Sequence, residues 1–299
     1  MKKYWLAPLA FFLLGTLFII INAPQVFALD ENGCLSCHGN SEFSKTNVDG
    51  QDISLFINNE IVNTAAHRFI DCTTCHSDDP HSDPLPLTKL SSAQKCGTCH
   101  EYQYRLHASS IHGQQLIKNN QDVATCVDCH SDGGNPHGVI RVLEHSSPTF
   151  KKNIHQTCAK CHGYEELMET YGLVERVYES YMRSFHGKAT ELGTYELSQL
   201  DKATCTNCHG AHDIKSVNDP TSPVAGLDNL AATCETCHDG AGVEFAAGFL
   251  GHEEASPENI PVAHYAEKFF STLMVSVIAF GVLIVTLAIV RYSRDRWKE

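Results

Sequence analysis

The chain has 299 residues, 14 cysteines and 18 histidines, with 42% hydrophobic and 19% charged residues and a formal net charge of −13. This composition argues against a wholly disordered chain, and the acidic balance argues against nucleic-acid binding, because phosphate contacts need clustered lysine and arginine. The negative charge is explained either as a solubility device or as electrostatic steering of a basic partner.

The N-terminal segment has the layout of a secretory signal peptide. Lys2 and Lys3 precede an apolar run that reaches Ile21, and Val26 and Ala28 occupy the −3 and −1 positions of a cleavage site. We predict a signal peptide over residues 1–28, so that the chain from residue 29 onward is exported. The apolar run is longer than usual, and an uncleaved anchor is the alternative.

All 14 cysteines fall into seven Cys-x-x-Cys-His motifs, the attachment signature of c-type haem. Two thiols one helical turn apart reach the two vinyl groups of one macrocycle, and the next imidazole becomes the proximal iron ligand. One Cys-x-x-Cys pair would be a weak signal, because zinc sites and redox pairs share it, but a histidine follows all seven. The predicted attachment residues are Cys34, Cys37, Cys72, Cys75, Cys96, Cys99, Cys126, Cys129, Cys158, Cys161, Cys205, Cys208, Cys234 and Cys237. The predicted proximal ligands are His38, His76, His100, His130, His162, His209 and His238.

The other histidines follow a repeat along the chain. One histidine lies between the two motifs of a pair, and another closely follows the second motif. The sequences Ser110–Gly113 and Ser184–Gly187 share the pattern Ser-x-His-Gly, which is typical of duplicated structural units. The predicted distal ligands are His67, His81, His112, His137, His186, His212 and His252. Two imidazole ligands would leave each iron with no open position.

Four histidines outside this repeat have more than one possible role. His107, His145 and His155 are either ligands or surface and supporting residues. His264 lies five residues before a long apolar run that begins at Phe269, so it is a ligand, part of a quinol site or an interfacial side chain.

The number of motifs constrains the fold. Roughly 240 residues between the signal and the apolar run would share seven haems, so no large side-chain core can surround each one. We predict a mainly α-helical fold with long loops, in which the macrocycles form the core of one heptahaem domain over residues 29–264. Apolar spacing predicts a helix over about 163–185, stopped near Gly187, and a second over 101–117; no strand pattern of any length is present.

The C-terminal segment predicts a membrane anchor. The 22 residues from Phe269 to Val290 include no Asp, Glu, Lys, Arg or His, and about 20 apolar residues span a bilayer as a helix. We predict a transmembrane helix over 265–292 and a basic cytoplasmic tail over 293–299, which makes this a single-pass protein of the cytoplasmic (inner) membrane with its haem domain on the extracytoplasmic side. The span has no histidine, so electrons would cross the membrane only through a partner subunit or a mobile quinone.

Several segments carry a family resemblance. The stretches Tyr181–Ala189, Cys205–Ile214, Asp219–Val224, Thr233–His238 and Phe249–His252 resemble multihaem cytochromes c with paired haem motifs, related loosely to the cytochrome c554 and cytochrome c3 groups. The resemblance extends from about Cys96 to His252. It implies low-spin bis-histidine haems beside a cytochrome b-type or other quinone-interacting subunit, with electrons passing between the quinone pool, including menaquinol, and other cytochromes or extracytoplasmic acceptors.

Two functions follow from these residues. The leading one is a membrane-anchored electron relay, for which we predict no catalytic residue. The alternative is a multihaem reductase of nitrite, hydroxylamine or a sulfur oxyanion, which needs one iron with an open position. Every motif ends in histidine, so the Cys-x-x-Cys-Lys motif of pentahaem nitrite reductases is absent.

Overall fold

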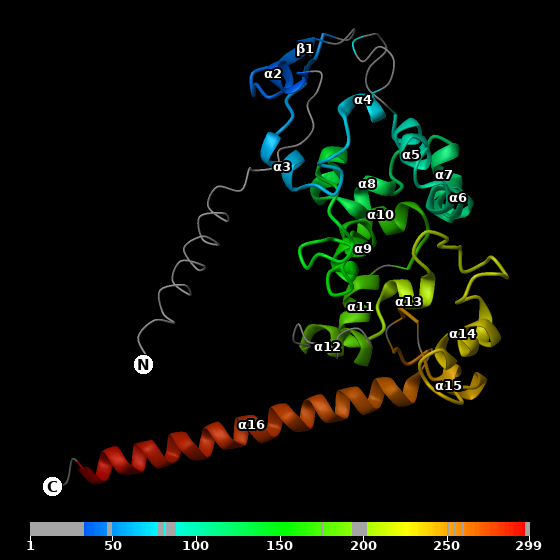
Figure 1. Cartoon of the computed structure of the whole chain (residues 1–299). Coiled ribbons are helices and arrows are strands. Elements are labelled where there is room, and N and C mark those ends of the chain that lie inside the picture. The colour runs from blue at the N-terminus through cyan, green and yellow to red at the C-terminus, as the bar shows by residue number, and fades with distance from the viewer. Residues whose placement is uncertain are drawn as a thin grey trace, which may run out of the picture. The chain divides into compact units, whose positions relative to one another are not determined.

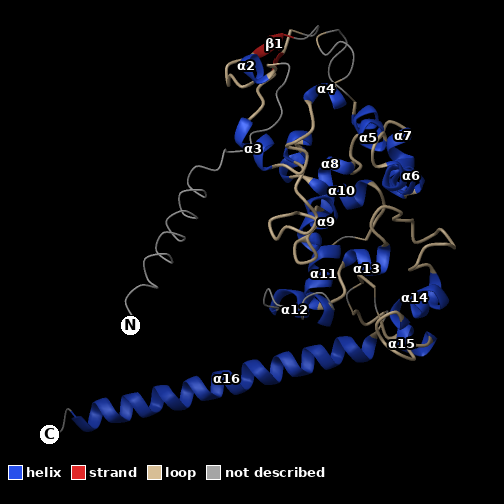
Figure 2. Cartoon of the chain, in the orientation of Figure 1, coloured by secondary structure: helices blue, strands red, loops and turns tan. Residues whose placement is uncertain are grey.

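The computed structural model describes residues 33–46, 50–76, 81, 88–174, 176–192, 202–249, 251–253, 255–258 and 260–296. The predicted signal peptide and the last three residues of the predicted tail lie outside these ranges. The described chain is mainly helical with very little strand, which confirms the predicted secondary-structure class (Figures 1 and 2). It divides into two compact units, one of residues 1–157 and 210–216 and the other of residues 158–209 and 217–299.

The first unit consists of short helices and one small hairpin. Its elements are α2 (Leu35–His38), β1 (Ser44–Thr46), β2 (Asp52–Ser54), α3 (Asn59–Thr64), α4 (Cys72–Cys75), α5 (Lys89–Gly97), α6 (Glu101–Ser109), α7 (Ile111–Ile117), α8 (Cys126–His130), the 3-10 turns η1 (Asp132–Gly134) and η2 (Pro136–Gly138), and the start of α9 (Ile154–His162). Strands β1 and β2 pair antiparallel, with Lys45 opposite Ile53. Helices α5, α6 and α7 pack together, and α3 packs on η2.

The second unit also consists of short helices, and it ends in one long helix. After the end of α9 come α10 (Glu165–Thr170), α11 (Val177–Arg183), α12 (Phe185–Leu192), α13 (Cys205–His209), α14 (Gly226–Glu235), α15 (Val243–Ala247) and α16 (Pro261–Arg296). Helix α11 packs on α12, and α14 packs on both α13 and α15. Apart from α16, every described helix has ten residues or fewer, a length at which a helix in water is marginal without tertiary support.

Side chains alone supply very little core in either unit. The buried hydrophobic residues among those described are Ala65, Ala93, Leu116, Met168, Ala231, Ala241 and Ala246. The largest side chains with under 2% exposure are four serines. Large apolar side chains stay open to solvent instead, such as Leu143 at 84% and Phe185 at 96% exposure. Protein interiors normally pack as densely as organic crystals. The described chain therefore has too few buried apolar side chains to form the core of a domain of this size.

The helix predicted over 163–185 is wrong in extent. The structure has two helices there, α10 and α11, and the chain between them leaves the helical conformation. Gly172 has a φ of 61° and Arg176 a φ of 57°, both in the left-handed region, which ends α10 and starts α11 in a new direction. The predicted stop near Gly187 is also wrong, since α12 runs through that residue to Leu192.

The helix predicted over 101–117 has the correct bounds but is broken at Ser110. This residue is extended, with φ −73° and ψ 165°, and its Oγ accepts a hydrogen bond from the Gly113 N–H at 3.1 Å. A serine side chain that caps a helix competes with continuation of the helix before it, which apolar spacing does not reveal.

Helix α16 is long and apolar enough to cross a membrane, with Pro261–Arg294 as the candidate span. It is the only such helix in the described ranges. It begins eight residues before the apolar run of Phe269–Val290, so about two helical turns precede that run.

Candidate functional site

Each Cys-x-x-Cys-His motif forms one helical turn that starts at its first cysteine. In four motifs the histidine N–H donates to the carbonyl of that cysteine at 2.9–3.0 Å, as at His38 and His238. The other three motifs lie inside α8, α9 and α13. This turn places both sulfur atoms on one side and directs the histidine ring beyond them, as attachment of a macrocycle requires.

Side-chain caps fix the start of two of these turns. Thr125 donates from both its N–H and its Oγ to the Asp128 carboxylate, at 2.7 and 2.8 Å. Thr204 does the same to the Asn207 side-chain oxygen, at 2.9 and 3.1 Å. The capping residue in each case is one of the two variable positions between the cysteines, so the motif holds its own helical turn in place.

Six motif histidines face the ring of a histidine from elsewhere in the chain. The pairs, with the distance between ring centroids, are His38–His81 at 6.5 Å, His67–His100 at 6.1 Å, His76–His137 at 6.0 Å, His130–His212 at 6.0 Å, His186–His238 at 6.1 Å and His209–His252 at 6.2 Å. Four pairs have nearly parallel planes, at 8–18°, and two are tilted, at 38° and 44°. Each pair joins one predicted proximal ligand to one predicted distal ligand.

The separation of the rings fits one metal ion between them. A ring nitrogen lies about 1.15 Å from the centroid of an imidazole with bonds of about 1.35 Å. A metal–nitrogen bond of about 2.0 Å then puts the centroids of two opposed imidazoles roughly 6.3 Å apart. The six pairs, at 6.0–6.5 Å, lie on both sides of this value. Rings stacked face to face in contact would be about 3.5–4.0 Å apart.

The facing imidazole rings form pairs and not larger clusters. Among the described residues, no group of three or more His, Cys, Asp or Glu side chains converges to hold an ion. All 14 cysteines lie within these ranges, and none forms a disulfide. Two opposed ligands are the number that an iron porphyrin needs, because the macrocycle supplies the four equatorial nitrogens itself.

Hydrogen bonds assign the ring proton to Nδ1 in one histidine of each of two pairs. His38 Nδ1 lies 2.8 Å from the Leu55 carbonyl, to which only a protonated Nδ1 can donate. His252 Nδ1 lies 3.0 Å from Ser180 Oγ, whose own proton goes to the Val177 carbonyl at 2.8 Å, so His252 is again the donor. Both rings therefore hold their proton on Nδ1 and present the Nε2 lone pair, as metal-bound histidines do.

Burial favours the neutral form of these imidazoles. It lowers the pKa of most paired rings, and in five of them the charge of the ring partner is the next cause. The rings with a lowered pKa are His67, His76, His130, His137, His186, His209, His212 and His252. A neutral imidazole is the form that binds a metal, so less free energy is spent on deprotonation when a metal enters.

The pairing follows a rule that the sequence repeat alone does not state. With the motifs numbered one to seven in chain order, His67 and His186 each follow an odd motif and face the motif two places further on. His137 and His212 follow even motifs and face the motif two places back. At the two ends the step shortens to one, through His81 and His252.

Two predicted ligands stand outside these six pairs, His112 on α7 and His162 at the end of α9. Both have side-chain interactions of their own, and burial lowers the pKa of His162. His112 occupies in the second repeat the place that His67 and His186 occupy in the first and third. By its place in the repeat, His112 stays a predicted distal ligand.

The Ser-x-His-Gly sequences form the same kink twice. Ser184 repeats the part of Ser110, since its Oγ accepts from the Gly187 N–H at 3.2 Å and donates to the Tyr181 carbonyl at 2.6 Å. The helix before each kink comes so close that a methyl group at Gly113 or Gly187 would overlap a backbone carbonyl oxygen. Glycine is therefore required directly after the histidine.

Replacing Gly187 with alanine is expected to lower the free energy of unfolding of the haem-loaded protein by about 1–3 kcal/mol, because a rigid backbone carbonyl must move. Denaturant unfolding followed by haem absorbance measures this. Gly281→Ala is the control, since a methyl group there meets nothing within 4 Å, and its unfolding midpoint should not change. An unchanged midpoint in Gly187→Ala would contradict the close approach.

The four histidines whose roles the sequence did not decide make other contacts or are buried. His107 Nε2 lies 3.1 Å from the Ala124 carbonyl, so that nitrogen carries a proton and is not an iron ligand. His264 Nδ1 donates to the Ala255 carbonyl at 3.0 Å, and the His145 ring lies 4.7 Å from that of Phe150. His155 is buried within α9, which lowers its pKa.

Sequence reasoning missed a second repeat that holds the fifth and seventh motifs. Five residues before the first cysteine, an asparagine Nδ2 donates to two carbonyls at 2.8 Å each, at Asn153 and again at Asn229. Directly before the cysteine, Thr157 and Thr233 donate to the carbonyl of an upstream proline at 2.7 and 2.8 Å. The pattern Ser-Pro, Asn, Thr-Cys is visible in the sequence and could have been found by aligning the two motifs on their cysteines.

Consecutive motifs lie close together within each unit. In the first unit, interaction with the Cys126 side chain lowers the pKa of the Cys96 thiol, which indicates that motifs three and four lie near each other. Burial and then the charges of Cys96 and Cys99 raise the pKa of the Cys75 thiol, which places motif two beside motif three. Burial and then the charge of His38 lower the pKa of His76, which places motif one beside motif two.

The second unit has the same continuity. Interaction with the Cys158 side chain lowers the pKa of the Cys205 thiol, which indicates that motifs five and six lie near each other. Burial and then the charge of Cys234 raise the pKa of the Cys208 thiol, which places motif six beside motif seven. Neighbouring Cys-x-x-Cys-His motifs are therefore a property of both units.

Comparisons with known proteins add no relative. No family model, curated protein or solved structure matches this chain.

Proposed function

We propose that this chain is a membrane-anchored heptahaem c-type cytochrome that relays electrons on the extracytoplasmic side of the cytoplasmic membrane. The observation that carries the proposal is the set of six imidazole pairs at 6.0–6.5 Å, each joining a Cys-x-x-Cys-His histidine to a remote histidine. A haem thioether-linked to the two cysteines and ligated by both rings would supply one-electron iron chemistry there.

The scarcity of buried side chains supports the same proposal. A macrocycle beside each of seven motifs would cover the exposed apolar side chains and complete a core that the described protein atoms do not make. The short helices would then be stabilised by packing on haem faces, which explains how helices of ten residues or fewer hold together.

The arrangement of motifs suits a relay more than a reaction centre. Two imidazole ligands per iron leave no position for a substrate, and the protein's part is to place, ligate and insulate the irons. Neighbouring motifs within each unit would give electrons a continuous path.

Helix α16 determines where the irons of the relay would lie relative to the membrane. Helix α16 contains no histidine after His264, so the irons would all lie outside the bilayer. We propose a cytochrome b-type or other quinone-interacting subunit and further cytochromes as partners, with the basic end of α16 in the cytoplasm.

Haem analysis and low-temperature EPR on the ferric full-length protein test this proposal. We expect seven haems per chain and low-spin signals only, because each iron would have two imidazole ligands. A stoichiometric high-spin signal would mean an open iron and would favour the reductase alternative. Fewer than seven haems per chain would contradict the heptahaem assignment directly.

A further inference from the structure

Helix α12 has a large apolar face that points to solvent. Phe185, its first residue, is 96% exposed, and Leu192, its last residue, is 80% exposed. Seven helical steps of 100° bring these two side chains to within about 20° of each other on one side of the helix. Gly187 and Thr190, which are buried, lie about 200° and 140° round the helix from Phe185. We call the side with Phe185 and Leu192 the outer face of α12; a surface helix ordinarily turns such a face toward the core.

One ion pair joins the start of α12 to the candidate membrane helix. Arg183, the last residue of α11, pairs with Glu267 of α16 at 2.8 Å between Nη2 and Oε1. Only Ser184 separates Arg183 from Phe185, so the Cα atoms of Arg183 and Phe185 lie at most about 7 Å apart. The outer face of α12 therefore begins close to the first turns of α16.

The same ion pair gives the depth of this corner relative to a bilayer. Glu267 lies two residues before Phe269, the first residue of the apolar run, and so about 3 Å outside that run along the helix. The headgroup layer outside the hydrocarbon core is about 5–8 Å thick on each side. With the apolar run in the hydrocarbon core, Glu267 and Arg183 lie in the headgroup layer, and Phe185 is within reach of the hydrocarbon.

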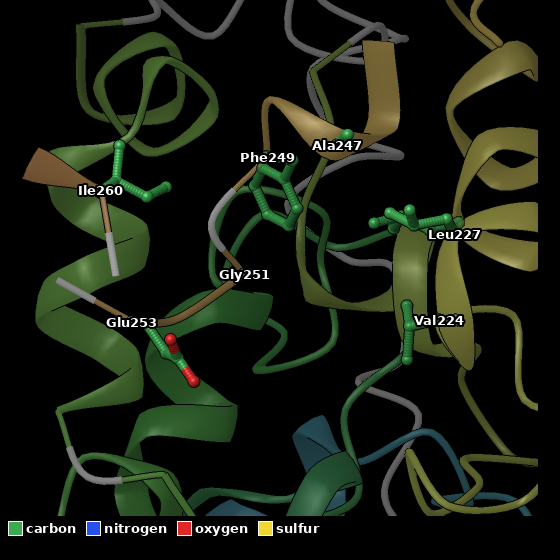
Figure 3. Close-up of a pocket in the computed structure, with 9 residues that line it drawn as sticks. Val224, Leu227, Ala247, Phe249, Gly251, Glu253 and Ile260 are labelled. Carbon is green, nitrogen blue, oxygen red and sulfur yellow. The ribbon is translucent and has the colours of Figure 1, made fainter. Parts of the chain in front are cut away.

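A second apolar surface of this unit lies farther from the apolar run. The α14–α15 pocket is a cavity of about 480 Å³ between α14, the end of α15 and the segment that leads into α16. Figure 3 shows its Phe249 ring between Ile260 on one side and Leu227 on the other. Ile260 directly precedes α16, whose first residue lies eight residues, or about 12 Å, before the apolar run and so outside the headgroup layer. The outer face of α12 is therefore the apolar surface that is joined to α16 at the depth of the headgroups.

We propose that the outer face of α12 lies in the membrane surface on the extracytoplasmic side, with Phe185 and Leu192 in contact with lipid acyl chains. This placement rests on the proposed membrane anchoring by α16. Aromatic side chains are favoured at the level of the headgroups, and a helix in this layer directs its apolar residues toward the acyl chains. The contact removes from water two apolar side chains that protein atoms leave at least 80% exposed.

The placement brings one imidazole pair to the membrane surface. His186 directly follows Phe185, projects about 100° round the helix from it, and faces His238 of the seventh motif at 6.1 Å. With Phe185 in lipid, the seventh motif lies next to the membrane. A membrane-bound redox partner would then meet this chain at the seventh motif.

A helix of a partner subunit is the other occupant that an outward apolar face could have. Such a helix needs no particular depth, whereas the ion pair with Glu267 holds the start of α12 at the level of the headgroups. Labelling the purified chain in lipid, with no partner present, distinguishes the two occupants.

Thiol labelling in nanodiscs of phosphatidylcholine measures the lipid contact. All 14 native cysteines belong to Cys-x-x-Cys-His motifs, so one added cysteine is the only free thiol of the haem-loaded full chain. We expect Phe185→Cys to react with a sulfonated maleimide at least about tenfold more slowly than Val262→Cys, because apolar surroundings suppress the reactive thiolate. Val262 is the matched control, since it is 80% exposed and lies on α16 about 10 Å before the apolar run, in water.

Two further variants complete the experiment. Leu192 lies on the same face as Phe185, so Leu192→Cys should be protected as well, and it serves if Phe185→Cys fails to load its haems. Met274 lies within the apolar run and is 61% exposed, so Met274→Cys gives the labelling rate of a thiol in the hydrocarbon core.

The lipid contact and the membrane anchor fail in different ways. If the cysteines at positions 185 and 192 react as fast as Val262→Cys while Met274→Cys is protected, the outer face of α12 lies in water. The contact is then overturned and the anchor stands. If Met274→Cys also reacts as fast as Val262→Cys, α16 does not span the bilayer, and both proposals are overturned.

Discussion

A chain in which all 14 motif cysteines are replaced by alanine is expected to lose its cooperative unfolding transition. The described protein buries seven hydrophobic residues, five of them alanine, and four serines are its largest fully buried side chains. Such an interior offsets only a small part of the conformational entropy lost on folding, which is about 1–2 kcal/mol for each backbone residue. The free energy of haem attachment and ligation would then be most of the free energy of folding, as in other metal-dependent domains.

The measurement compares the alanine-substituted and haem-loaded chains by thermal unfolding and amide hydrogen exchange, both in the same detergent. We expect the substituted chain to retain protection in α16, whose hydrogen bonds depend on the detergent, and to lose it in α5–α15. The haem-loaded chain is the control and should unfold in one or two sharp transitions, one for each compact unit. A substituted chain with sharp transitions and protected motif helices would show that side chains alone make the core.

Part of this architecture could be predicted from sequence because the motif spacing is local. The spacing from Cys126 to His130 matches one helical turn, as attachment of one macrocycle would require, so the motif predicts its own local structure. Helix α16 was equally predictable, because an uncharged apolar run of bilayer length is rare in the helices of soluble proteins.

The pairing of histidines could not be predicted, because it depends on where separate segments meet. His137 lies seven residues after His130 but faces His76, and His212 lies three residues after His209 but faces His130. Nearness in sequence favours the nearest motif, and the helical turn of that motif points its ring elsewhere. Which motif each remote histidine faces is therefore a tertiary property, decided by how the separate segments fold together.

The positions of the helix ends were also predicted wrongly, and the reason lies in the local backbone conformation. The apolar spacing from Tyr164 to Phe185 is that of a helix, yet Gly172 and Arg176 adopt left-handed conformations between α10 and α11. Apolar spacing indicates which side chains are buried. In this chain, macrocycles and not a neighbouring helix would bury them. A stripe of residues can face haems from two short helices as well as from one long helix.

Replacing His212 with methionine is expected to raise the reduction potential of one haem in seven, by on the order of 100 mV, and to leave its iron six-coordinate. His212 faces His130 at 6.0 Å, with the two ring planes 8° apart, the most nearly parallel of the six pairs. A thioether is a softer ligand than an imidazole and stabilises ferrous iron, so the shift is upward. Potentiometric titration followed by haem absorbance measures it, and EPR of the ferric form should stay low-spin.

His145→Met is the matched control, since His145 is an exposed histidine in the same unit whose ring lies against Phe150. Its titration curve should overlay that of the wild type. The two variants together separate ligation from a general effect of losing an imidazole. If His212→Met holds seven haems and titrates as the wild type does, the His130 iron takes its sixth ligand from elsewhere, and the two-place pairing rule fails where the geometry is most regular.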